Sequence, residues 1–145
     1  MVKLLQVARV PAIVAPPDMT VLQAVVKMDE AQVGAILIAD EEMKLLGIFT
    51  ERDNMLRMTL KQRNPETTRL KEVMSAPVQT ASPEITPEEA LNRMIKSKYR
   101  HLPIVDKNNK ILGVVSVRQL LLRRVSQQES NIEVLAAYAN AGGPG

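Results

Sequence analysis

The chain has 145 residues, of which 46% are hydrophobic but only 2% aromatic, so its core must be aliphatic. It has no cysteine and one histidine, which excludes disulfides, thiolate chemistry and a histidine-rich metal site. The net charge of +3 suits an anionic small ligand and falls short of the basic stripe of a dedicated DNA-binding protein. Because no apolar run is long enough to span a membrane and the first residues do not resemble a signal peptide, we expect a cytoplasmic protein.

The first half of the sequence alternates strand and helix patterns. Residues 11–15 are predicted to form a short strand, and the Pro-Pro-Asp of 16–18 is typical of a turn. Thr20, with Gln23 three residues later, predicts a capped helix, and Gly34 is expected to end it. The remaining elements expected in this half are strands over 35–39 and 45–50 and a helix over about 51–61.

The second half repeats this order after a polar linker at 61–69. A constant offset of 66 residues aligns the halves without a gap, so that Pro11 meets Pro77 and Gly47 meets Gly113. The elements expected here are strands over 78–81, 102–105 and 111–116, a helix beginning at Thr86, a helix over 117–125 and a further short helix over 130–139.

These patterns predict an α/β (α+β) fold of two β-α-β-β-α repeats. One repeat buries too little surface to be stable alone, so we expect the two to be related by a pseudo-twofold axis and packed through their sheets. We assign 1–66 to the first repeat with its linker and 67–128 to the second. A C-terminal helix and flexible tail are expected over 129–145. The stretch 73–77 is interpreted as a segment that locks the second repeat.

Motifs of common enzyme classes are absent, including phosphate-binding glycine loops and a zinc-binding H-E-x-x-H, so we expect no catalytic activity. The candidate binding feature is Thr50-Glu51-Arg52-Asp53 at a strand-to-helix junction. A helix N-terminus there favours an anion, Asp53 can accept both hydroxyls of a ribose, and Arg52 can pair with phosphate. The same spacing is also that of an ordinary helix cap. Arg100 and His101 are either two phosphate-directed donors or a solvated strand edge.

Three stretches taken together resemble the CBS domain signature, and the resemblance spans roughly residues 5–126. They are LGIFTERD at 46–53, VMSAP at 73–77 and RHLPIVD at 100–106. The resemblance implies a Bateman module, which is a CBS pair that binds adenine nucleotides in two clefts between its repeats.

The resemblance also implies which residues line each cleft. In the first cleft Asp53 would hold the ribose, Val78 and Pro103 the adenine, and Thr50, Arg52, Arg100 and His101 the phosphate, with Thr80 beside them. The second cleft would use Ser116, Arg118 and Gln119 with Ile13, Ala15, Gly34 and Ala35. In that cleft Gln119 replaces the ribose-binding acid and Gly34-Ala35 the basic pair. We therefore predict one good site and one weak or empty site.

The leading functional hypothesis is a sensor of AMP, ADP or ATP that acts on an unidentified protein target. It requires no cofactor, and the sequence leaves open whether Mg²⁺ accompanies ATP. Alternatives are an S-adenosylmethionine sensor, a nucleic-acid-binding protein, which the pI near 9.3 allows, and a purely dimerising scaffold. We expect a homodimer whose interface is supplied by exposed helices. The faces expected to form it carry Val21, Val25, Leu56, Leu60, Leu121 and Leu122.

Overall fold

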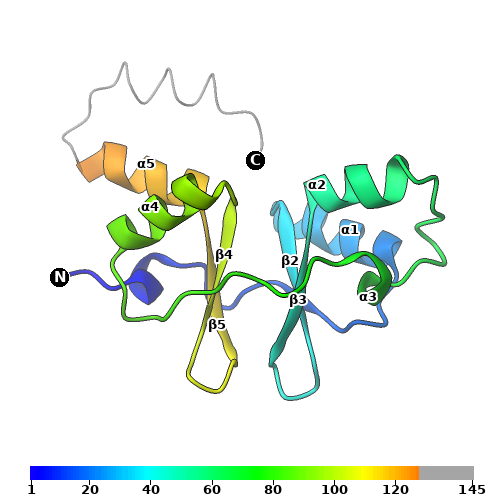
Figure 1. Ribbon diagram of the computed structural model, residues 1–145, viewed down its shortest axis with the longest axis horizontal. Coiled ribbons are helices and arrows are strands. Elements are labelled where there is room, and N and C mark those ends of the chain that lie inside the picture. Colours follow the sequence, from blue (N-terminus) through cyan, green and yellow to red (C-terminus); the bar gives the residue numbers. More distant parts are fainter. Residues whose placement is uncertain (128–145) are drawn as a thin grey trace.

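Two small sheets stand side by side, and helices cover each of them in the computed structural model, which describes residues 1–127 (Figure 1). The first half contains β1 (Val14–Ala15), α1 (Val21–Ala31), β2 (Ala35–Ala39), β3 (Leu45–Thr50), α2 (Glu51–Asp53) and a π-helical turn, η2 (Asn54–Thr59). The second half contains α4 (Pro87–Ser97), β4 (His101–Val105), β5 (Ile111–Ser116) and α5 (Val117–Gln127). Two short helices precede these halves, η1 (Leu4–Val7) and α3 (Leu70–Val73). The helix expected over 130–139 and the tail lie outside the described residues.

The repeated α/β architecture predicted from the sequence is confirmed. In the first half β1 runs parallel to β2, and β2 pairs antiparallel with β3. In the second half β4 and β5 form the matching antiparallel pair. Thr20 and Gln23 form the expected capping box, but α1 ends at Ala31, where Gln32 adopts a left-handed conformation (φ 55°) before Gly34 is reached.

The strand expected over 78–81 is reduced to an isolated bridge between Ala81 and Ile104, so that prediction was wrong. In the first half the backbone N–H of Leu37 donates to the carbonyl of Ile13 at 3.0 Å and extends the parallel pairing. Pro103 occupies the position equivalent to Leu37. Because proline has no N–H, this hydrogen bond is lost and the strand does not extend.

The two segments that lead into the halves cross over (Figure 1). Leu4 of η1 is fully buried in the core of the second half, and Arg9 pairs with Val114 of β5. Val73 of α3 is buried in the core of the first half, and Ser75 pairs with Ile48 of β3. The stretch 73–77 was expected to lock the second repeat. It packs on the first repeat instead. The segment that precedes each half therefore packs on the other half.

Two equivalent glycines make this crossing over sterically feasible. A Cβ atom on Gly47 would lie 2.5 Å from the Sδ of Met74 and 3.0 Å from the carbonyl oxygen of Ser75. A Cβ atom on Gly113 would lie 2.9 Å from the carbonyl oxygen of Arg9. A side chain at either glycine would therefore push away the segment that has crossed over.

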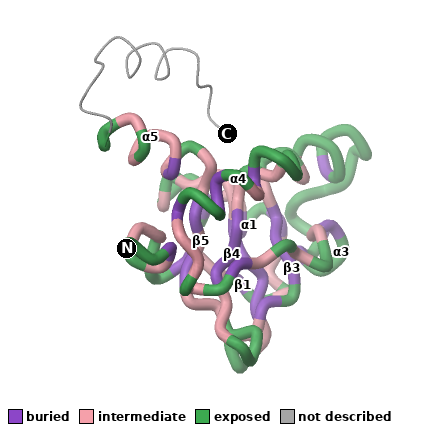
Figure 2. The backbone as a smooth tube through the Cα atoms, turned by 60° about the vertical axis from the view of Figure 1, so that its left-hand side comes forward, coloured by how far each residue is buried: buried purple, intermediate pink, exposed green. Residues whose placement is uncertain are grey.

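The sheets of the two halves pack against each other, as predicted, and the most deeply buried residues lie along the central strands (Figure 2). A third cluster of apolar side chains draws on both halves. It joins Ala12, Leu37, Leu45 and Ile48 to Val78, Val105, Ile111 and Val114. Among residues 1–127, no helix is long and apolar enough to cross a membrane.

A group of exposed apolar side chains lies on α1 and on the α2–η2 helix of the first half. Those on these helices are Leu22, Val26, Met55, Leu56 and Leu60, and others, such as Ile95 of α4, are exposed singly elsewhere. Of the residues expected at a dimer interface, Leu56 and Leu60 are exposed, but Val21 is fully buried in the first core and cannot contact another chain. Val25 packs against the first core and Leu121 against the second.

Candidate functional site

A cavity of about 640 Å³ lies between the halves. Its walls come from α1 and the start of β2 on one side, and from the end of β5 and the start of α5 on the other. The N-terminal segment that has crossed over contributes Arg9, and β4 contributes His101. Because both repeats and a crossing segment line the cavity, a ligand held there would contact both halves at once.

The cavity coincides with the cleft that the sequence predicted to be weak. Ile13, Ser116, Arg118 and Gln119 all line it, as do Gly34 and Ala35. Ala15, the remaining residue of that prediction, is 2% exposed and belongs to the first core. The sequence-based ranking compared only the residue types of the two clefts. It could not include the volume that the packed structure leaves open at each of them.

Ser116 and Gln119 are positioned by the start of α5. The backbone N–H of Gln119 donates to the Oγ of Ser116 at 3.1 Å, which is the first of the two bonds of a capping box. The Gln119 side chain turns elsewhere, and its Nε2 donates to the carbonyl oxygen of Val7 at 2.6 Å. Gln119 thus connects the wall of the cavity to the N-terminal segment, 112 residues earlier in the chain.

The cavity carries charges of both signs. Arg9 and Arg118 supply two cations, while Asp29 and Glu51 supply two anions. Burial, and after it the charge of the adjacent Arg100, lower the pKa of His101 to about 4, so this imidazole is neutral at pH 7. A polar ligand could therefore meet guanidinium donors, carboxylate acceptors and a neutral imidazole within one space.

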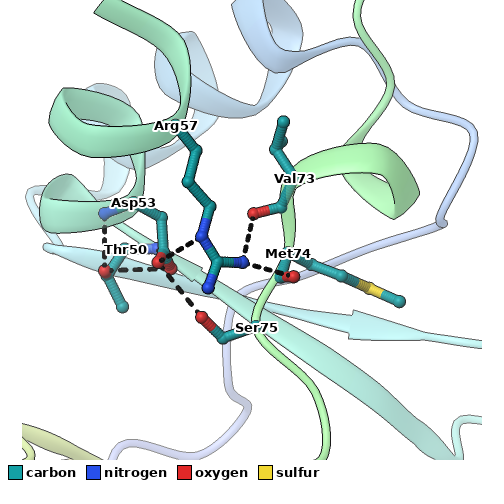
Figure 3. A network of polar contacts seen from close by, with 6 residues as sticks. All are labelled: Thr50, Asp53, Arg57, Val73, Met74 and Ser75. Carbon is teal, nitrogen blue, oxygen red and sulfur yellow. Dashed lines mark hydrogen bonds and ion pairs between the residues drawn. The ribbon is translucent and has the colours of Figure 1, made fainter. Parts of the chain in front are cut away.

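The Thr50–Asp53 stretch forms a closed hydrogen-bond network at the start of α2 (Figure 3). The Asp53 carboxylate accepts from the backbone N–H of Thr50 at 3.0 Å and from the Thr50 hydroxyl at 3.1 Å. Its other oxygen accepts from the hydroxyl of Ser75 at 3.1 Å and lies 3.8 Å from the guanidinium of Arg57. The helix cap anticipated from the spacing is confirmed, and it is tied to the segment that has crossed over.

The other residues predicted for the first cleft have separate surroundings. Val78 packs into the cluster between the sheets, and Pro103 is buried in β4. The carbonyl of Thr80 accepts a hydrogen bond from Arg93 at 2.8 Å. Arg52 and Arg100 are exposed, whereas His101 lines the 640 Å³ cavity of the other cleft.

Sequence reasoning missed several residues of these sites. Arg9, Asp29 and Glu51 line the cavity, and Arg57 and Ser75 complete the Asp53 network. Arg9 and Ser75 occupy equivalent positions in the repeats, just before the motifs that align. Comparing the stretches ahead of Pro11 and Pro77 could have drawn attention to both, but no local pattern tells which half such a segment joins.

The CBS domain family model matches residues 6–53 and 70–126, once in each half. A CBS domain-containing protein of Bacillus subtilis is 33% identical over 79% of this chain and 79% of its own length. An uncharacterised protein of Methanopyrus kandleri is 34% identical over 80% of the chain. Inosine-5'-monophosphate dehydrogenase of Methanocaldococcus jannaschii is 35% identical over 77% of it. The chain spans 59% of the length of the Methanopyrus relative and 21% of the dehydrogenase.

Solved structures share the arrangement of the two halves. A chain from Burkholderia ambifaria, described as a signal-transduction protein with CBS domains, superposes with a TM-score of 0.79 at 28% identity, covering 90% of this chain and 99% of its own. A CBS domain protein of Pyrobaculum aerophilum solved with AMP gives 0.74 at 18% identity, covering 86% and 99%. A CBS domain pair solved with 5'-methylthioadenosine and S-adenosyl-L-methionine gives 0.78 at 22% identity, covering 89% and 99%. At these last two identities the likeness concerns the fold.

Proposed function

Because this chain belongs to the CBS domain family, with one domain in each half, we propose that it is a regulatory module that binds AMP, ADP or ATP in the cavity between its repeats. The cavity of about 640 Å³ carries the proposal, because it falls within the range of small-molecule sites and both repeats line it. Two relatives of the same fold, solved with AMP and with adenosine-containing sulfur compounds, support an adenosine ligand. We expect binding without catalysis and a response read by another protein.

The residues of the cavity suit the parts of a nucleotide. Ile13 and Val114 offer apolar surface to a base, and Ser116 and Gln119 offer hydrogen-bonding groups to a ribose. Arg9 and Arg118 offer guanidinium groups, which recognise phosphate through paired donors. For signalling, the ligand must bind one arrangement of the repeats more tightly than another.

Titration of the purified protein with AMP, ADP and ATP by calorimetry tests the proposal. We expect saturable binding of at least one of these nucleotides, and Arg118→Ala should weaken it about tenfold or more, as for a lost hydrogen bond to a charged group. Wild-type protein that gives no heat and no thermal shift with any of the three would refute adenine-nucleotide binding.

A second substitution separates the two clefts. The sequence-based ranking predicts that the stronger site uses Asp53, whereas the cavity uses Arg118. An Asp53→Ala protein that binds as tightly as wild type, beside a weakened Arg118→Ala protein, would support the cavity. Loss of binding in Asp53→Ala alone, with an unchanged melting temperature, would instead favour the Asp53 cleft.

A specific observation favours a second ligand class, S-adenosylmethionine. Asp29 and Glu51 place two carboxylates in the cavity, and these would attract the sulfonium and ammonium cations of that compound. Calorimetry with S-adenosylmethionine in parallel decides between the two classes. Asp29→Asn should weaken S-adenosylmethionine binding and leave AMP binding equal or tighter.

A further inference from the structure

Asp53 and Gln119 occupy equivalent positions in the two repeats, and each one reaches a segment that has crossed over from the other half. Asp53 contacts the hydroxyl of Ser75, and Gln119 contacts the carbonyl of Val7. Each contact joins the start of a helix to the segment that packs on the same half. The structure therefore contains two matched contacts of this kind, although the residue types differ.

The polarity of each side chain matches its partner. A carboxylate can only accept, and Asp53 meets the O–H donor of Ser75. A carbonyl oxygen can only accept, and the one presented by Val7 requires a donor. The amide of Gln119 supplies that donor, whereas a carboxylate at position 119 would place like partial charges against each other. The glutamine thus fits a segment that presents a carbonyl.

The contact with Val7 also sets which end of the amide the cavity receives. With one N–H of Nε2 donating to the Val7 carbonyl at 2.6 Å, Oε1 is the acceptor that the amide of Gln119 can offer to the cavity it lines. We propose that the Val7 carbonyl is the positioning group that orients the Gln119 amide, so that Oε1 rather than Nε2 is presented to a ligand hydroxyl in the cavity. The proposal rests on the proposed function, since it concerns the ribose of the ligand placed in the cavity.

The N-terminal segment is then a part of the binding site. It orients Gln119 through Val7, and two residues later it supplies the guanidinium of Arg9 to the same cavity. The segment is held on β5 by two hydrogen bonds between Arg9 and Val114, of 2.9 and 3.2 Å. Ligand affinity should consequently depend on how firmly residues 4–9 are docked.

Gln119→Glu distinguishes this proposal from the expectation that an acid is the better ribose acceptor at this position. If Val7 orients the side chain, Gln119→Glu should bind AMP and adenosine about tenfold more weakly than wild type, since one hydrogen bond is replaced by a repulsion. Adenosine carries no phosphate, so a loss of adenosine affinity in Gln119→Glu cannot come from repulsion between the new carboxylate and a phosphate. Gln119→Met, which has similar length and no amide, should also weaken both ligands.

Gln127→Glu is the matched control, because it introduces the same change at an exposed position of the same helix. It should leave both affinities within twofold of wild type. Gln119→Glu binding AMP and adenosine as tightly as wild type, or more tightly, would overturn the proposal.

A measurement without ligand tests the contact with Val7 separately. The backbone N–H groups of Arg9 and Val114 each donate to the carbonyl oxygen of the other residue, and their hydrogen exchange should become at least fivefold faster in Gln119→Glu and Gln119→Met than in wild type. Unchanged exchange would show that Gln119 does not hold the segment and would refute the inference. If wild type binds no adenosine compound while exchange rises as expected, the proposed function and the ligand-accepting role of Oε1 fail, and only the positioning by Val7 stands.

Discussion

The guanidinium of Arg57 lies 3.8 Å from the carboxylate of Asp53, which precedes it by four residues on the same helix (Figure 3). The ionic contact is made by Nε, while the Nη1 atom donates to the carbonyl oxygens of Val73 at 3.0 Å and Met74 at 2.8 Å. Arg57 thereby fastens the α2–η2 helix to the segment that crosses over from the other half. The ionic contact is partly exposed and contributes little by itself, so the carbonyl contacts carry most of the effect.

Arg57→Ala should lower the free energy of unfolding by about 1–2 kcal/mol, because two backbone carbonyls lose a charged donor. Urea unfolding at pH 7 measures the change. Arg57→Lys is the matched control, since it keeps the charge but lacks the planar fork of a guanidinium, and it should fall between wild type and Arg57→Ala. Equal stability of all three proteins would show that the contacts seen around Arg57 do not stabilise the fold.

Alanine at the glycines should destabilise the protein in a graded order. Gly113→Ala should cost most, about 1–3 kcal/mol, because its Cβ would meet the backbone oxygen of Arg9 at 2.9 Å. Gly47→Ala should cost less, since the closest atom is in the flexible side chain of Met74. Gly34→Ala serves as the control, with the end of the Glu51 side chain at 3.2 Å. Thermal melts of the three variants measure the order, and a Gly34→Ala protein less stable than Gly113→Ala would contradict it.

The stability should depend on pH through His101. Burial, followed by the charge of Arg100, lowers the pKa of His101 to about 4 in the folded state, against 6.5 for an unperturbed histidine. Between pH 6.5 and pH 4 the imidazole binds a proton in the unfolded chain but not in the folded protein. The stability present above pH 6.5 is therefore lost as the pH falls toward 4. The loss is at most about 3 kcal/mol and is reduced by the partial exposure of the ring.

Urea unfolding between pH 7.5 and pH 4 measures this loss. His101→Gln removes the titrating group and should flatten the profile in that window. Carboxyl groups contribute their own slope near pH 4, so the comparison is the difference between wild type and variant. An identical slope in both proteins would show that His101 titrates normally when folded.

The expected homodimer can be tested at the exposed apolar side chains of the first half. Leu60 is 67% exposed on the η2 side, and Ile95 is 57% exposed on α4 of the second half. If the dimer forms through the first half, Leu60→Glu should convert it to a monomer, because a charge would be buried without a partner. Ile95→Glu is the control and should stay dimeric. Sedimentation velocity measures both, and a wild-type monomer at micromolar concentration would refute the dimer.

The duplication and most of its local elements were predictable from the sequence. Helix starts such as Thr20 with Gln23 depend on contacts three residues apart, and a buried strand such as 35–39 shows as a run of apolar residues. These signals are local, so a single sequence contains them in readable form.

The crossing of the N-terminal segment and of α3 was decided by tertiary structure. An extended stretch such as 73–77 can pair with either sheet, and its own residues do not say which. The same long-range pairing explains the strand lost at 78–81, where Pro103, more than twenty residues later, withholds the N–H that a partner would need.

The two clefts show that residue types alone do not predict how a side chain is used. From the sequence alone we could compare the residue types at positions 53 and 119, and a carboxylate is expected to form stronger hydrogen bonds than an amide. Only the tertiary structure decided how those groups are used, because Ser75 and Arg57 engage the acid while Val7 engages just one end of the amide. A side chain that donates to or accepts from a neighbouring residue has fewer hydrogen bonds left for a ligand. In this protein the neighbours of Asp53 and Gln119 include residues from distant parts of the chain.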